Sequence, residues 1–119
     1  MKKQNKIFYW SPSLVSIATN DAVINSAYSL SRYNKIYDTY IINFFGEFER
    51  FREKINKKRI KTIDYYNKSL FKILPRHGKI KSRFSFIIIF LLSFYPLKNI
   101  LKKENPDYLI IHLITSLPL

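Results

Sequence analysis

The chain has 119 residues, of which 47% are hydrophobic and 17% aromatic, and it contains no cysteine. Its length predicts a single domain, and its composition excludes an intrinsically disordered segment. The lack of cysteine excludes a disulfide scaffold, a thiolate metal site and a cysteine nucleophile, and it is typical of a protein from a reducing cytoplasm.

The formal net charge of +13 is compatible with a nucleic acid or an anionic membrane as a partner. The basic excess is concentrated in residues 50–83, which carry 13 Lys or Arg against only Glu53 and Asp64. However, Lys, Asn, Ile, Phe and Tyr are all abundant, and their A/T-rich codons would raise all five without selection for a ligand. The charge therefore leaves both a binding surface and a merely solvated basic face open.

The first half of the chain predicts two strands separated by a helix. The apolar run Lys6–Trp10 ends at Ser11-Pro12 and indicates a buried strand; it is too short for a secretory signal. Residues 19–33 carry apolar side chains at helical spacing, and Thr19, Asn20 or Asp21 can cap that helix. The run 38–45 indicates a second strand, which Gly46 closes.

The second half predicts two more strands and a long helix. Residues 47–58 indicate a short helix or loop, and residues 59–64 a short third strand. Residues 65–83 fit no regular element clearly, and Pro75 and Gly78 favour a loop over residues 74–83. Residues 84–101 predict a long helix that is bent or restarted at Pro96, and residues 108–112 a final buried strand.

This order of elements predicts an α/β fold, a Rossmann-like and mostly parallel sheet flanked by helices. Because the strands are continuous apolar runs, we expect them to be buried on both faces. In the common strand order 3-2-1-4, ligands bind beyond the carboxyl ends of the first and last strands. The segment from Ser11 to Asp21 and the segment from His112 would then meet in one crevice. The helix N-terminus there would favour an anion.

The apolar run 84–97 has 14 residues, fewer than the ~20 that a membrane span needs. With the basic segment before it, the run is typical of a helix docked on an anionic membrane surface. A core helix beside a solvated basic face stays open as an alternative, as does a true span.

Few side chains suit catalysis. His112 is either a substrate contact at a strand exit or a satisfied structural histidine, and Asp21 is either a crevice carboxylate or a helix-start residue. We expect the remaining strand carboxylates to lie at strand starts, on the opposite edge of the sheet: Asp38, Asp64 and Asp107. The sequence shows no glycine-rich phosphate loop, no metal-ligand cluster and no G-x-S-x-G elbow.

Four segments, in order and spacing, resemble the N-terminal half of family 4 glycosyltransferases of the GT-B fold: "KIFYWSPS", "AVINSAYSLSRY", "YDTYIINFF" and "LKKENPDYLIIHL". The last one matches the family's Lys-x-x-Pro-Asp-x-x-x-x-His element at Pro106, Asp107 and His112. The similarity covers nearly all of residues 1–119. One departure is the loop after the first strand, where Ser16 to Thr19 stand in place of the family's two glycines.

The resemblance implies a retaining enzyme that uses a nucleotide-sugar as co-substrate, with no other cofactor and no metal. The acceptor would be a lipid-linked or polysaccharide intermediate of cell-envelope glycan synthesis, at the inner face of the membrane. His112 would be the catalytic residue beside the transferred sugar. The residues expected to line the acceptor side are Ser11, Ser13, Thr19, Asn20, Asp21 and Ser116.

The resemblance also implies that residues 1–119 form an incomplete N-terminal domain. The donor-binding domain would be absent, and the fragment alone would be inactive, cytoplasmic and peripheral on the membrane. Two other functions stay open. One is a non-catalytic basic protein of the membrane surface. The other is a nucleic-acid-binding module, although no nucleic-acid motif is visible and no nucleic-acid partner is expected.

Overall fold

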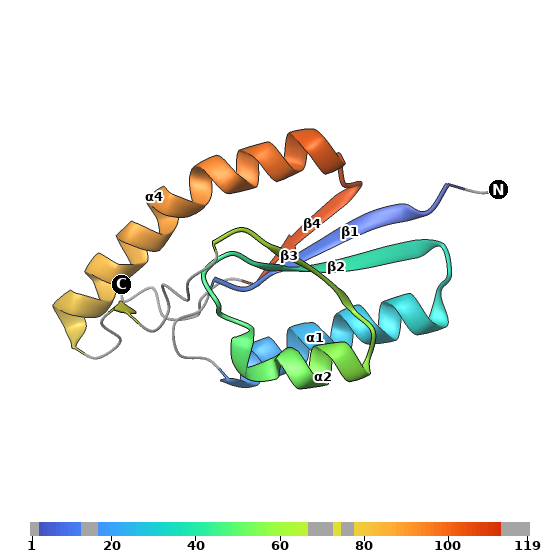
Figure 1. Ribbon diagram of the computed structural model, residues 1–119, viewed down its shortest axis with the longest axis horizontal. Coiled ribbons are helices and arrows are strands. Elements are labelled where there is room, and N and C mark those ends of the chain that lie inside the picture. Colours follow the sequence, from blue (N-terminus) through green and yellow to red (C-terminus); the bar gives the residue numbers. More distant parts are fainter. Residues whose placement is uncertain (1–2, 13–16, 67–72, 75–77, 113–119) are drawn as a thin grey trace.

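The computed structural model of the chain describes residues 3–12, 17–66, 73–74 and 78–112. Four parallel strands form one sheet in the order β3-β2-β1-β4. Helices cover both faces of this sheet, and the predicted Rossmann-like α/β fold is confirmed (Figure 1). The strands are β1 Asn5–Trp10, β2 Tyr37–Asn43, β3 Lys61–Asp64 and β4 Tyr108–Ile111.

The central strand β1 pairs with β2 on one side and with β4 on the other. The chain passes from β1 to β2 and β3 in one direction, and then crosses back to place β4 beside β1. The reversal of strand order therefore lies between β1 and β4, as predicted. The carboxyl ends of the strands and the N-terminus of helix α1 lie at the same end of the molecule (Figure 1).

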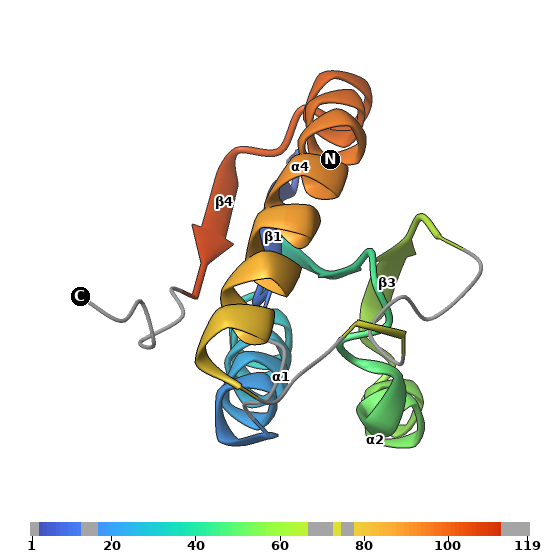
Figure 2. The same cartoon turned by 90° about the vertical axis from the view of Figure 1, so that its left-hand side faces the viewer.

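One face of the sheet is covered by α1 (Ile17–Tyr33) and the short α2 (Arg52–Lys57), which follows the 3-10 turn η1 (Glu49–Phe51). Figure 2 shows both helices on the side of the sheet away from α4. The residues Ile7 and Tyr9 of β1 point into this layer, because alternate residues of a strand face opposite sides. They pack with apolar residues of α1, β2, α2 and the segment before η1: Val23, Ile24, Ala27, Ile41, Phe48 and Ile55.

The other face is covered by a single helix, α4 (Lys79–Glu104), which packs against Phe8 and Trp10. The helix is not restarted at Pro96, because it runs through this buried proline. Proline has no N–H to offer the carbonyl four residues earlier. That carbonyl, of Leu92, instead accepts a hydrogen bond from the Tyr66 hydroxyl at 2.8 Å. The helix also begins before residue 84, so the predicted loop is wrong for residues 79–83.

The prediction that all strands are buried on both faces is wrong for the two outer strands. In β1 and β2 most side chains are buried, whereas none in β3 or β4 is. Tyr108, Ile110 and Ile111 of β4 are 56%, 38% and 42% exposed. Their apolar character indicates a strand that needs cover, yet in the described part of the chain β4 is an edge strand.

Candidate functional site

The exit of β1 carries a buried hydroxyl with no partner. Ser11 follows the last residue of the strand, is fully buried, and its Oγ has no hydrogen-bond partner. A buried polar atom without a partner is costly and rare in folded proteins. The hydroxyl of Ser11 is therefore a candidate ligand contact at the point where the sheet order reverses.

A second unpartnered atom belongs to Asn20, which is buried in the first part of α1. Its side-chain amide donates a hydrogen bond to the backbone oxygen of Glu47 at 2.9 Å. Its side-chain oxygen, Oδ1, accepts none. The side-chain nitrogen of Asn20 thus holds α1 against the loop after β2, and its Oδ1 can accept a hydrogen bond from a bound ligand.

Glu47 joins these elements, and the sequence did not identify it. Its Oε2 accepts a hydrogen bond from the backbone N–H of Phe45 at 2.7 Å, and its Oε1 accepts one from Trp10 Nε1 at 3.3 Å. The carboxyl is buried among aromatic side chains, and this burial raises its pKa to about 7, against an ordinary value near 4.5. We refer to Trp10, Ser11, Asn20 and Glu47 as the exit cluster.

His112 lies beside this cluster by register. The last pair between β1 and β4 is Trp10 with Ile111, so Ser11 and His112 are the next residues of two neighbouring strands. The His112 N–H donates to the Trp10 oxygen at 2.8 Å. Its ring stacks on Tyr9, with ring centroids 6.5 Å apart. The histidine is half-buried and held in place by both contacts.

The other predicted acceptor residues are more scattered. Thr19 is half-buried in the first turn of α1, near Asn20. Asp21 makes an ion pair with Lys54 of α2, and this pair ties the two helices together. Ser13 and Ser116 lie outside the residues that the structure describes. The structure thus brings Ser11, Asn20 and His112 to one edge and connects Asp21 to α2.

One carboxylate was placed on the wrong edge by the sequence. Asp64 is the last residue of β3, not the first, and lies at the carboxyl edge. Its Oδ1 accepts hydrogen bonds at 2.8 Å from both Asn43 and Arg52, and Glu49 accepts from the same two side chains. Burial acts to raise the pKa of Asp64, but hydrogen bonds from Arg52 and Asn43 outweigh it and lower the pKa. These charged side chains pair with one another, so they do not indicate a ligand site.

Within the described residues, no three His, Cys, Asp or Glu side chains gather as metal ligands would. No family model, curated protein or solved structure matches the chain. The site is therefore described from the chemistry of its own residues and not from a related protein. A buried donor, a buried acceptor and a carboxyl that titrates near neutral pH lie at the strand exits, with an imidazole beside them.

Proposed function

We propose that this chain is the acceptor-side half of a retaining glycosyltransferase that uses a nucleotide-sugar donor. The observation that carries the proposal is the pair of unpartnered buried atoms, Ser11 Oγ and Asn20 Oδ1, at the switch point of the sheet. A hydroxyl can donate and an amide oxygen can accept, and a sugar hydroxyl needs one of each. The resemblance to family 4 supplies the reaction, and the exit cluster supplies a place for the acceptor.

In this proposal His112 lies beside the transferred sugar, and Ser11 and Asn20 orient the acceptor. Thr19 and Asp21 border the same end of α1. The donor would be held mainly by a second Rossmann-like domain. The acceptor would be a lipid-linked or polysaccharide intermediate, which is consistent with a cytoplasmic chain that works at the membrane surface.

The test uses the single tryptophan as a reporter, because Trp10 Nε1–H bonds to Glu47 and gives one isolated indole signal in ¹⁵N NMR spectra. The probes are the methyl glycosides of glucose, galactose, mannose and N-acetylglucosamine, at millimolar concentration. We expect at least one glycoside to shift the indole signal and the Asn20 side-chain amide signals. Ser11→Ala should weaken that binding roughly fivefold, since it removes one hydrogen bond of about 1 kcal/mol.

Ser31→Ala is the matched control. Ser31 lies near the other end of α1, where its hydroxyl donates to the Tyr28 oxygen. This variant should bind the glycoside as the unchanged chain does. The absence of a shift with all four glycosides would count against the proposal. So would a shift that Ser11→Ala leaves unchanged.

A second candidate function is that of a non-catalytic protein of the membrane surface. It is favoured by one observation that the exit cluster does not explain. The long helix α4 turns a row of large apolar side chains towards solvent.

A further inference from the structure

Helix α4 is apolar on both of its faces. Its inner face packs on the sheet through residues that recur every three or four positions: Ile89, Ser93, Pro96 and Ile100. By length and composition, this 26-residue helix is long enough to cross a membrane. The apolar run 84–97, with 14 residues, underestimated the length of the helix. Only 22% of its most apolar 18-residue window is buried. A helix that is apolar all round normally lies in a core or a membrane.

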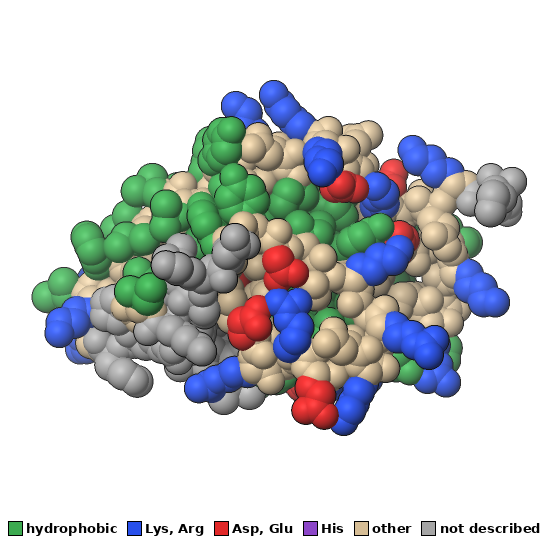
Figure 3. All heavy atoms as spheres, in the orientation of Figure 1, with side chains coloured by type: hydrophobic (Ala, Val, Ile, Leu, Met, Phe, Trp, Pro, Cys, Tyr) green, Lys and Arg blue, Asp and Glu red, His purple; other side chains and the backbone are tan. Residues whose placement is uncertain are grey.

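The outer face of α4 is the largest apolar surface among the described residues. Eight large side chains there are between 39% and 83% exposed. Monomeric soluble proteins rarely expose so many large apolar side chains side by side. Figure 3 shows this apolar surface over α4. We call it the α4 stripe, and its members are Ile80, Phe84, Ile87, Phe90, Leu91, Leu92, Phe94 and Tyr95.

Basic side chains lie at both ends of the α4 stripe. Lys79, Lys81 and Arg83 precede its middle, and Lys98, Lys102 and Lys103 follow it. The one acidic residue of the helix, Glu104, is already paired with Lys6 at 3.0 Å. Among the described residues no carboxylate pairs with Lys98 or Lys102. The surface therefore combines an apolar centre with the charges of Lys98 and Lys102, which no carboxylate among the described residues neutralises.

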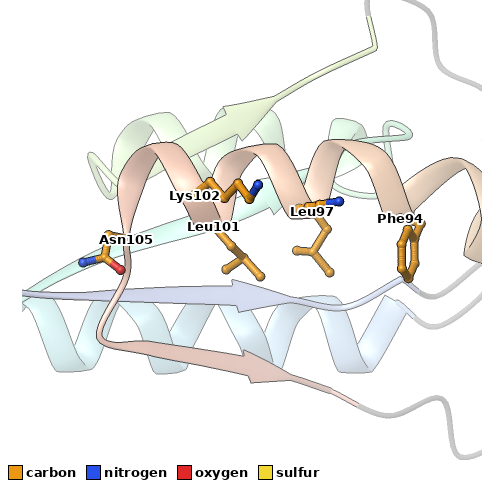
Figure 4. A pocket seen from close by; sticks show the side chains of 6 residues that line it. Phe94, Leu97, Leu101, Lys102 and Asn105 are labelled. Carbon is orange, nitrogen blue, oxygen red and sulfur yellow. The ribbon is translucent and has the colours of Figure 1, made fainter.

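A groove lies where the α4 stripe meets these lysines. It has a volume of about 490 Å³ and is lined by Phe94, Leu97, Leu101, Lys98, Lys102 and Asn105. In Figure 4 the side chains of Leu97 and Leu101 point from α4 towards the strands, and Phe94 of the α4 stripe stands at one end of the groove. The groove thus offers apolar walls beside two ammonium groups, which is the chemistry of an acyl chain beside an anionic headgroup.

We infer that α4 is an interfacial helix that docks this chain on a bilayer containing anionic lipid. The α4 stripe would enter the acyl boundary, while Lys98, Lys102 and the basic residues at the other end contact headgroups. A nucleic acid would match the charge but leave the apolar side chains exposed. A second copy would match the apolar side chains but place like charges together. A bilayer with anionic lipid satisfies both features.

This inference does not rest on the proposed transferase function. The two are connected only by geometry, because the N-terminal end of α4 and the exit cluster lie at the same end of the molecule (Figure 1). Docking through α4 would therefore bring the exit cluster towards the membrane surface. Failure of glycoside binding would leave docking intact, and failure of docking would leave the exit cluster intact.

The test is flotation of the full chain with vesicles of phosphatidylcholine, with or without about a third phosphatidylglycerol. We expect binding to the anionic vesicles, weakened by salt, and little binding to the neutral ones. The double variant Ile87→Asp, Leu91→Asp should bind at least about tenfold more weakly, because two apolar side chains leave the bilayer. Lys98→Gln and Lys102→Gln should each cost roughly fivefold on anionic vesicles.

Ile36→Asp is the matched control, since Ile36 is 51% exposed outside α4 and Ile87 is 53% exposed within it. It should leave binding unchanged, and circular dichroism checks the fold of every variant. Four results would overturn the inference. The first two are vesicle binding by the double variant equal to that of the unchanged chain, and a dimer that the double variant abolishes while no vesicle binding is seen. The other two are binding to a generic oligonucleotide but not to vesicles, and retention on the vesicles after an alkaline carbonate wash, which would indicate a membrane span.

Discussion

Strands β1 and β2 on one side of the sheet and β4 on the other are built from similar residues, but they lie in different environments. On one side, β1 and β2 are rich in Ile, Phe and Tyr, and helices cover them on both faces. On the other side, β4 has the sequence Tyr-Leu-Ile-Ile, and three of its four side chains are exposed. An apolar strand sequence thus indicates that cover is needed, but it does not say that the cover is present.

The same contrast runs through the helices. The α1 side chains that point inwards, Val23, Ile24 and Ala27, are fully buried, and its outer face is polar. Helix α4 instead carries apolar residues inside and outside. The region around β1, β2 and α1 therefore completes its own core, whereas the region of β4 and α4 presents a surface that a partner or a bilayer would complete.

The largest expected effect tests whether the β1–β2 region supplies most of the stability. Phe8→Ala empties a fully buried site that contacts Tyr40 edge-on, and we expect it to cost about 3–5 kcal/mol in the free energy of unfolding. Ile111→Ala, on the exposed strand β4, should cost less than about 1 kcal/mol. Urea denaturation measures both values. Comparable losses would mean that β4 is covered in solution and that the contrast between the two regions is false.

A smaller effect depends on pH and tests the burial of Glu47. The pKa of this carboxyl is near 4.5 in the unfolded chain and about 7 in the folded one. The folded state then binds this proton more tightly, so the contribution of Glu47 to stability is full below pH 4.5 and is lost as the pH rises to about 7. The loss amounts to roughly 3 kcal/mol, and Glu47→Gln should abolish it. Urea denaturation at pH 4.5, 6 and 7.5 measures the difference.

Glu53→Gln is the control for this experiment. Glu53 lies on α2, is mostly exposed and pairs with Lys57 one turn later. Its substitution should leave the pH dependence of the free energy of unfolding unchanged. Parallel pH profiles for Glu47→Gln and the unchanged chain would mean that water reaches this carboxyl.

The fold was largely predictable because its signals are local. Apolar runs ended by Ser11-Pro12 and by Gly46 marked β1 and β2, and helical spacing marked α1. The sequence could not show the continuity of α4, because Pro96 normally interrupts a helix. A residue thirty positions earlier, Tyr66, supplies the hydrogen bond that its missing N–H would have made. Such a tertiary replacement leaves no trace in local spacing.

The site was predicted only in part. Ser11, Asn20 and His112 were expected at the strand exits because chain order places them there, and the structure puts them at that edge. Glu47 was missed because it follows Gly46 in a charged segment that reads as surface. Only the fold shows that it turns inwards to Trp10 and Phe45. Asp64 was misplaced because it was grouped with Asp38 and Asp107 at strand starts, although the predicted strand 59–64 already ended at it, as β3 does.

The central claim is that α4 docks on an anionic bilayer. Its most direct test is amide hydrogen exchange, detected by mass spectrometry, on the chain with and without vesicles that contain phosphatidylglycerol. Binding to the folded state slows local opening where the contact lies. We predict that amides of residues 79–104 exchange at least about tenfold more slowly with anionic vesicles, and that those of β1 and β2 do not change. Unchanged exchange in α4, or equal slowing by neutral vesicles, would contradict the claim that α4 docks on an anionic bilayer.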